Sequence, residues 1–224
     1  MISPEVLISE FKKISTGAIS DSMDFLGIPS GVIVNGPKPI NFDPDKARMV
    51  GFACTVQQMP KRQVNPGSVK NIDVYNSIAQ PGQIVVFDAG GRMDAATTGG
   101  LQMVRAKVRG LGGVIINGCC RDADEIIKGD MPFFCKGTCP RKSVVFETVG
   151  INVPITVSNV QICPGDLIVG DATGLIVISA EVAEKVLERA QFIKRVEDEM
   201  ERRLLAGEDY SGLRKRVEAE LQKA

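Results

Sequence analysis

Two short apolar segments separated by a helix-length stretch constrain the fold of this chain most. Residues 83–87 read QIVVF and residues 114–117 read VIIN, so each is long enough for one buried strand. Between them Leu101, Val104 and Val108 recur at helical spacing and would form the apolar face of a helix. A crossover of this length typically joins two parallel neighbouring strands. The sequence therefore predicts an α/β fold in which these two strands end side by side.

Glycine-bearing loops follow both predicted strands. Asp88–Gly91 follows the first strand, with the helix expected from Asp94 onward, and Gly118–Asp122 follows the second strand. In α/β sheets, ligands bind beyond the carboxyl ends of the strands. The two loops are therefore the first place to expect a functional site.

Helices are predicted at both ends of the chain. Residues 3–14 and 16–26 show helical spacing, with Ser15 or Thr16 as the cap of the second helix. The C-terminal third is highly charged and predicts helices over residues 180–205 and 209–221. Further strands are expected at 31–34, 52–58, 154–157, 167–169 and 175–178, and a helical segment at 69–79. We expect one domain over residues 1–224, with N-terminal helices at 1–28, an α/β core at 29–179 and C-terminal helices at 180–224.

Composition excludes several classes of protein. The 27 lysines and arginines balance 27 aspartates and glutamates, so no net basic field is available for binding nucleic acid. No apolar run approaches the ~20 residues of a membrane-spanning helix, and the first residues lack the pattern of a signal peptide. We expect a cytoplasmic protein without a nucleic-acid or membrane partner. Because histidine is absent, any chemistry would rest on carboxylates, arginine, lysine, a thiolate or a metal with oxygen ligands.

The six cysteines are interpreted as reduced thiols. Disulfides are typical of small secreted domains, whereas this chain is long enough to bury a core without them. The alternative is a thiolate metal site formed by Cys119, Cys120, Cys135 and Cys139, although their spacing matches no usual zinc pattern. We expect Cys119 and Cys120 to be small packing residues at the end of a strand.

The sequence NGCCRDADEI at residues 117–126 places charged residues directly after the second strand. Asp122 and Glu125 fit a capping pattern, in which Asp122 accepts backbone amide hydrogens and Glu125 is structural. Capping does not explain Arg121, and an arginine beside a carboxylate is also suited to holding an anionic substrate next to a magnesium ion. These residues alone leave both interpretations open.

The segment Thr98–Gln102 (TGGLQ) adds an element to this site. It lies near the predicted start of a helix, where unpaired amides and the helix dipole attract an anion. Its two glycines could instead serve only close packing against the sheet. With Arg121 on the adjacent strand end, a carboxylate would be held from both sides, so a small oxo acid beside a metal is a coherent ligand set.

Four segments resemble one known family: Thr16–Asp24, Pro81–Asp88, Gly112–Asp122 and Pro164–Asp171. Their order is similar to that in the family that joins 4-hydroxy-4-methyl-2-oxoglutarate aldolase to the regulator of ribonuclease E activity A. The resemblance covers roughly residues 15–205. It implies a layered β/β/α fold of the swivelling phosphohistidine-domain type, a homotrimer that can pair into a hexamer, and active sites in clefts between subunits.

For the aldolase branch, the resemblance implies a Mg²⁺ or Mn²⁺ ion held by Asp122 and by waters. Arg121 would bind the pyruvyl end of a small 2-oxo acid, helped by the backbone amides of Leu101 and Gln102. The reaction would be retro-aldol cleavage of a 4-hydroxy-2-oxo acid, or decarboxylation of oxaloacetate, through the enolate of pyruvate. A glutamate from the neighbouring subunit, Glu197 or as second choice Glu199, would support the metal waters.

Position 100 departs from the family pattern, which places an acidic residue before Arg-Asp with twenty residues between them. Gly100 stands there, and Asp94 or Asp88 is a candidate replacement from the preceding loop. Gly99 and Gly100 would still belong to the substrate site as the start of a helix. The leading hypothesis is a metal-dependent carbon–carbon lyase. The alternative is a protein-binding regulator of ribonuclease activity with a vestigial cleft, which Gly100 favours and the long C-terminal helix disfavours.

Overall fold

The computed structural model describes residues 2–62 and 69–223, and the chain divides into two compact units. One unit, Gly31–Ala183, contains the sheets. The other comprises the two ends of the chain, Met1–Ser30 and Glu184–Ala224. These boundaries lie within a few residues of those expected at 28/29 and 179/180, whereas a single domain for the whole chain stays a prediction.

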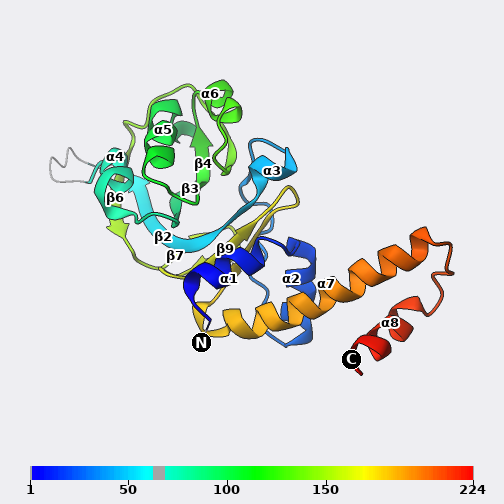
Figure 1. The fold of residues 1–224 in the computed structure, drawn as a ribbon. Helices are drawn as coiled ribbons and strands as arrows, with labels where there is room; N and C mark the ends of the chain where they lie inside the picture. Colours follow the sequence, from blue (N-terminus) through cyan, green and yellow to red (C-terminus); the bar gives the residue numbers. More distant parts are fainter. Residues whose placement is uncertain (1, 63–68, 224) are drawn as a thin grey trace. The chain divides into compact units, whose positions relative to one another are not determined.

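The larger unit is built on a mixed sheet (Figure 1). Its strands follow the order β1-β5-β4-β3-β2-β9-β10, and β6 pairs with β2 off this path. The parallel strands are β2 (Met49–Pro60), β3 (Ile84–Thr98), β4 (Gly113–Cys120) and β5 (Phe133–Thr138). The antiparallel strands are β1 (Lys38–Pro39), β6 (Phe146–Ile151), β9 (Leu167–Gly170) and β10 (Leu175–Ile178). The α/β class is confirmed, and the swivelling phosphohistidine type stays a prediction.

The predicted crossover is present as β3, α5 (Gly100–Val108) and β4, and its two strands are parallel neighbours. However, β3 continues through the expected loop 88–91 and through residues 94–98, where a helix was expected. Gly90 and Gly91 have φ of 65° and 70°, and the pairing shifts register three times between Asp88 and Thr98. Such bulges bend a strand without removing it from the sheet. The prediction that the helix begins at Asp94 is therefore wrong.

Helix α5 buries a different face from the one that its apolar residues predicted. Met103 and Ala106 are buried, whereas Leu101, Val104 and Val108 are 84%, 60% and 70% exposed. The helical period is right, but the assignment of its apolar stripe to the core is wrong. A periodic stripe shows only that one face is apolar, and here that face lies on the surface.

The remaining elements of this unit match the sequence to different degrees. The helical segment predicted at 69–79 contains α4 (Asn71–Asp73) and a π-helix η1 (Val74–Ile78), and α6 (Ala123–Lys128) follows the charged cluster. A hairpin of β7 (Ile155–Val157) and β8 (Val160–Ile162) and a short helix α3 (Pro44–Ala47) complete it. The strand expected at 31–34 is wrong, because Val32 forms only an isolated bridge with Ile176. Strands β1, β5, β6 and β8 were not predicted.

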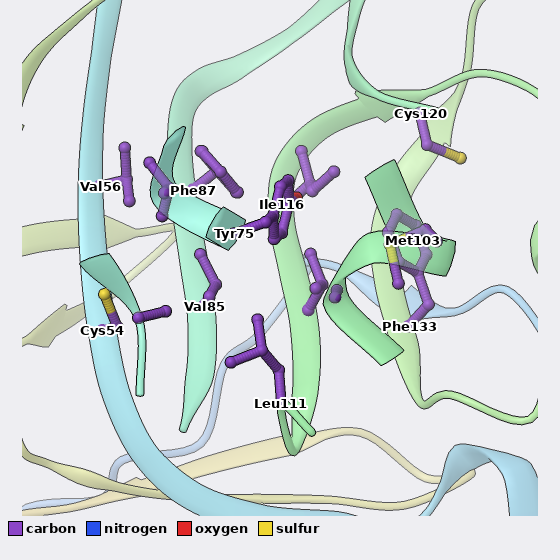
Figure 2. Close-up of a cluster of buried hydrophobic side chains, with 14 of the residues drawn as sticks. Cys54, Val56, Tyr75, Val85, Phe87, Met103, Leu111, Ile116, Cys120 and Phe133 are labelled. Carbon is purple, nitrogen blue, oxygen red and sulfur yellow. The ribbon is translucent and has the colours of Figure 1, made fainter. Parts of the chain in front are cut away.

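Alternate residues of the central strands fill two separate hydrophobic clusters. Val85, Phe87 and Ile116 belong to the cluster drawn in Figure 2, whereas Ile84 and Val86 belong to the other. Successive side chains of a strand point to opposite faces, so the continuous apolar runs are buried on both faces of the sheet. Burying one such side chain contributes about 1.5–3 kcal/mol. The two clusters thereby fix the ends of β3 and β4, where the candidate site residues follow.

The smaller unit is helical, as predicted. Its helices are α1 (Pro4–Phe11), α2 (Thr16–Phe25), α7 (Ala183–Leu205), which follows the 3-10 helix η2 (Ala180–Val182), and α8 (Leu213–Leu221). Ser3 and Ser15 cap α1 and α2 by accepting amide hydrogens from Val6 and Ala18. Helices α7 and α8 pack through a cluster of Val196, Met200, Leu213 and Val217. Among the described helices, none is both long and apolar enough to cross a membrane.

The cysteines are free thiols, as predicted. Cys119 and Cys120 are both fully buried, and Sγ of Cys120 lies 3.8 Å from Sγ of Cys135 on the neighbouring strand. Burial raises the pKa of the Cys54 thiol to about 11. Within residues 2–62 and 69–223, no group of three or more cysteines and carboxylates is arranged to hold a metal.

Candidate active site

A cavity of about 470 Å³ lies where β3 and β4 end and α5 begins. Of the residues predicted for the site within this chain, five line it: Gly99, Leu101, Gln102, Arg121 and Asp122. The other walls come from the end of β2, from α4, from β6 and from the segment before β6. The cavity therefore occupies the position expected for a ligand site in an α/β sheet, beyond the carboxyl ends of parallel strands.

Asp122 stands at the start of α6, but its side chain does not cap that helix. Its backbone is left-handed, with φ 56° and ψ 41°, which turns the carboxylate back toward α5. There Oδ2 accepts a hydrogen bond of 3.1 Å from the amide of Gly100. The predicted cap position is thus right and the predicted capping bond is wrong, because the carboxylate stabilises the amino end of the neighbouring helix instead.

Gly99 gives Asp122 the room for this contact. A Cβ at Gly99 would lie 2.5 Å from Oδ2 of Asp122 and 3.0 Å from Cγ and Nε of Arg121. A side chain at position 99 would therefore displace both predicted functional groups. Gly99 is needed for a close approach of side chains to the backbone and not for its φ of −148°, which any residue adopts.

Glu125 fills the space beside Gly100. Its Oε2 lies within the volume that a Cβ at position 100 would occupy, and its Cδ and Cβ lie 3.0 and 3.2 Å from that point. A carboxylate from the first turn of α6 thus lies next to residue 100. Glu125 does not itself line the cavity. The sequence does not reveal this contact, because Glu125 and Gly100 lie on different helices.

The other two candidate acids lie elsewhere. Asp88 is buried and accepts hydrogen bonds from Asn117, Gln57 and the amide of Gly90. Asp94 pairs with Arg92 at 2.7–2.9 Å, and this hydrogen bonding holds the pKa of Asp94 below its usual range. Neither residue lines the cavity. The expectation that one of them replaces the missing acid is wrong.

Arg121 enters the site from the last position before Asp122. Its amide donates to the carbonyl of Thr98 at 3.0 Å, which ties the end of β4 to the end of β3. Its Nε lies 3.5 Å from Oδ2 of Asp122, and both side chains are about two-fifths exposed. An ion pair this exposed contributes little to stability, so the guanidinium remains available for an anionic ligand.

A chain of hydrogen bonds runs from the core into the cavity wall. The hydroxyl of Tyr75 donates to Oγ1 of Thr98 at 3.2 Å, and Oγ1 of Thr98 donates to Oε1 of Gln102 at 2.5 Å. The backbone amide of Gln102 is bonded to the carbonyl of Gly99 at 3.1 Å. In this structure the backbone amide of Gln102, which the resemblance assigns to substrate binding, is therefore already paired.

Several cavity residues were not found from the sequence. Lys70 and Asn71 come from the start of α4, Lys142 from the segment before β6, and Phe146 and Glu147 from β6. Lys142 is held at the site by a bridge to Ala96. No local pattern marks these residues, because they reach the cavity only through contacts between segments that are distant in the sequence.

The two glutamates expected from a neighbouring subunit differ in their surroundings. Glu199 accepts hydrogen bonds of 2.7 Å from Arg202 and Arg203, and these bonds lower its pKa to about 2. Glu197 is exposed on the same helix, α7. Glu199 is thus engaged within its own helix, which leaves Glu197 as the better candidate, and its role stays a prediction.

Comparison with known proteins identifies the family of this chain. The family model described as RraA-like, Aldolase/RraA, matches residues 16–177. The chain belongs to this family. A relative from Halalkalibacterium halodurans, named "Putative 4-hydroxy-4-methyl-2-oxoglutarate aldolase", is 35% identical over 201 residues, which cover 89% of this chain and 88% of the relative.

Two solved structures share the fold of this chain. An uncharacterized protein from Pseudomonas syringae superposes with a TM-score of 0.82 at 26% identity, covering 95% of this chain and all of the other. Streptomyces coelicolor RraAS2, described as an unusual member of the RNase ES inhibitor RraA protein family, gives a TM-score of 0.81 at 25% identity over 91% of this chain and all of its own. The family thus includes proteins named for an aldolase and proteins named for ribonuclease inhibition.

Proposed function

We propose that this protein is a divalent-metal-dependent carbon–carbon lyase acting on small 2-oxo acids. The observation that carries the proposal is the convergence of Arg121, Asp122 and Glu125 on the first turn of α5. A guanidinium and two carboxylates at a helix start, beside a cavity of about 470 Å³, suit an anionic substrate held next to a cation.

The donor set fits Mg²⁺ or Mn²⁺. Such ions take oxygen ligands, and Mg²⁺ usually keeps several waters and uses only one or two protein carboxylates. Asp122 would hold the ion, and Glu125 presents a second carboxylate at the same turn of α5. When bound, the cation supplies Lewis-acid stabilisation of negative charge on the 2-oxo oxygen.

The chain's own groups would bind and orient the substrate. Arg121 offers parallel N–H donors that match a carboxylate, which favours the pyruvyl end of the substrate. The amide of Leu101 lies in the first turn of α5 between the paired amides of Gly100 and Gln102, and it has no partner in the described part of the chain. Retro-aldol cleavage of a 4-hydroxy-2-oxo acid and decarboxylation of oxaloacetate both leave the same pyruvate enolate, so one site would serve both reactions.

An assay for pyruvate tests this function. The purified protein is incubated with Mg²⁺ or Mn²⁺ and either oxaloacetate or 4-hydroxy-4-methyl-2-oxoglutarate, and pyruvate is measured with lactate dehydrogenase. We expect turnover that Asp122→Ala abolishes and Glu125→Gln lowers about 10- to 100-fold. Asp94→Asn, which changes a carboxylate outside the cavity, should retain activity. Pyruvate at background levels, or full activity in Asp122→Ala, would overturn the proposal.

We also propose a homotrimer that can pair into a hexamer, with Glu197 of a neighbour reaching the cavity. The exposed stripe of Leu101, Val104 and Val108 supports this, because it is an apolar surface beside the cavity that a second subunit would cover. Light scattering during size-exclusion chromatography tests it, and a monomer at micromolar concentration would overturn it.

The second candidate function is a protein-binding regulator of ribonuclease activity. It is favoured by the likeness to Streptomyces coelicolor RraAS2. Co-purification with an endoribonuclease at physiological salt, unaffected by Asp122→Ala, would support it. Binding seen only at very low salt would count against it, because weak electrostatic association is screened as salt rises.

A further inference from the structure

Tyr75 brings a polar group into an otherwise apolar cluster. Its side chain is fully buried and its ring lies 5.7 Å from that of Phe87, in the cluster drawn in Figure 2. A buried hydroxyl needs an acceptor for its hydrogen, since an unpaired one is costly. Oγ1 of Thr98, 3.2 Å away, is that acceptor. Burial also raises the pKa of Tyr75, so the hydroxyl keeps its hydrogen throughout the physiological pH range.

Thr98 extends this chain of hydrogen bonds to Gln102. A threonine hydroxyl has one hydrogen, and Oγ1 of Thr98 accepts from Tyr75, so its own hydrogen goes to Oε1 of Gln102 at 2.5 Å. With the amide reversed, Nε2 would donate to Oγ1 and the Thr98 hydrogen would lose this acceptor, so the amide oxygen of Gln102 faces Thr98 and Nε2 faces the other way. The orientation of the Gln102 amide is thus set by a tyrosine in the core.

Thr98 also fixes the position of Arg121. Its carbonyl accepts the amide of Arg121 at 3.0 Å, so one residue at the end of β3 orients both a guanidinium-bearing residue and an amide side chain. Gln102 and Arg121 both line the cavity. Nε2 of Gln102 has no hydrogen-bond partner among the residues that the structure describes, although the side chain is partly buried.

We propose that the side-chain amide of Gln102 donates a hydrogen bond to an oxygen of the 2-oxo-acid substrate, and that Tyr75 and Thr98 are positioning residues that keep Nε2 toward the substrate. The inference rests on the proposed function and adds a specificity residue to it. With Nε2 of Gln102 held as a donor, the site favours substrates that present an oxygen acceptor to it. A ligand with an N–H group at that point would leave both donors unpaired.

The test compares oxalate binding and steady-state kinetics in the intact protein with Mg²⁺. Oxalate has the planar paired oxygens of a 2-oxo acid and binds without reacting, so calorimetry separates binding from turnover. Gln102→Leu should weaken oxalate binding and raise KM about tenfold, since a hydrogen bond to a charged acceptor is lost. The matched control is Gln161→Leu, which changes an exposed glutamine in β8 outside the cavity and should leave both constants unchanged.

The positioning role is tested by a double-mutant cycle, with thermal unfolding to verify that each variant is folded. Tyr75→Phe should raise the oxalate Kd about threefold in the wild-type background and leave it unchanged in the Gln102→Leu background. A purely structural role would weaken binding equally in both backgrounds and would overturn the positioning role. Wild-type Kd and KM in Gln102→Leu, in a protein that still forms pyruvate, would overturn the inference alone. Absence of both oxalate binding and pyruvate formation in the wild type would overturn the proposed function and the inference together.

Discussion

Replacing Gly100 by alanine should separate the stability of this protein from its chemistry. The added Cβ would fall on Oε2 of Glu125, with Cδ and Cβ of that side chain at 3.0 and 3.2 Å. The carboxylate end of Glu125 is flexible and can rotate away, whereas its Cβ has to yield by a few tenths of an ångström. The substitution therefore moves one carboxylate and leaves the surrounding backbone in place.

The expected magnitudes follow from two opposing effects on stability and one on function. Alanine in place of a helical glycine stabilises by roughly 0.5–1 kcal/mol, and overpacking costs about 1–3 kcal/mol, so the free energy of unfolding should fall by about 1 kcal/mol. Loss of a carboxylate that supports a metal site costs about 10- to 100-fold in affinity or activity, equivalent to about 1.4–2.8 kcal/mol. Function should fall much further than stability.

The assays are Mg²⁺ titration by calorimetry, pyruvate formation and thermal unfolding. Gly17→Ala is the matched control, because Gly17 also lies in the first turn of a helix, α2, and a Cβ there meets nothing closer than Oγ of Ser15 at 3.8 Å. In the double variant Gly100→Asp with Glu125→Ala, a carboxylate returns from the opposite helix, and activity should exceed that of Glu125→Ala alone. Unchanged Mg²⁺ affinity and activity in Gly100→Ala would refute the reasoning.

Three further predictions concern other parts of the molecule. Because hydrogen bonds to its neighbouring arginines lower the pKa of Glu199 from 4.5 to about 2, the stability that this carboxylate contributes should be complete above pH 4.5 and lost as pH falls toward 2. Thermal melts between pH 2 and 6 should show a weaker pH dependence for Glu199→Gln, and an identical profile would contradict the assignment. Glutamate at Leu101 or Val104 should lower the oligomeric mass measured by light scattering, since it places charge on an exposed apolar stripe; an unchanged mass would show that the stripe is not an interface. Of the six thiols, Cys139 and Cys163 are only partly buried and should react first with Ellman's reagent in the native protein, and equal reactivity of all six would contradict the burial described.

The sequence was sufficient for the framework of the site. Hydrophobic periodicity and the length of the crossover predicted the parallel pair of β3 and β4. This pairing brings Arg121 and Asp122 next to the start of α5. Local patterns succeeded there because strand order and crossover length leave few alternatives.

The details that failed are those set by tertiary contacts. The bulged second half of β3, past Asp94, is held by its pairing with β4. This part of the strand has no apolar run that would predict a strand from the sequence. Asp122 has a normal capping pattern, yet its left-handed backbone directs the carboxylate to Gly100. The contact of Glu125 with Gly100 joins residues on different helices. No spacing rule within one element could have found it.

The left-handed backbone at Asp122 has a consequence for redesign. Asparagine tolerates this conformation better than most residues, and its side-chain oxygen can accept the Gly100 amide as the carboxylate does. Asp122→Asn should therefore fold into the same cavity while removing one negative charge. The two side chains have the same shape and differ in one heavy atom. The Asp122→Asn variant would therefore be an inactive protein with an unchanged cavity, suited to identifying ligands that bind through shape and not through the charge of Asp122.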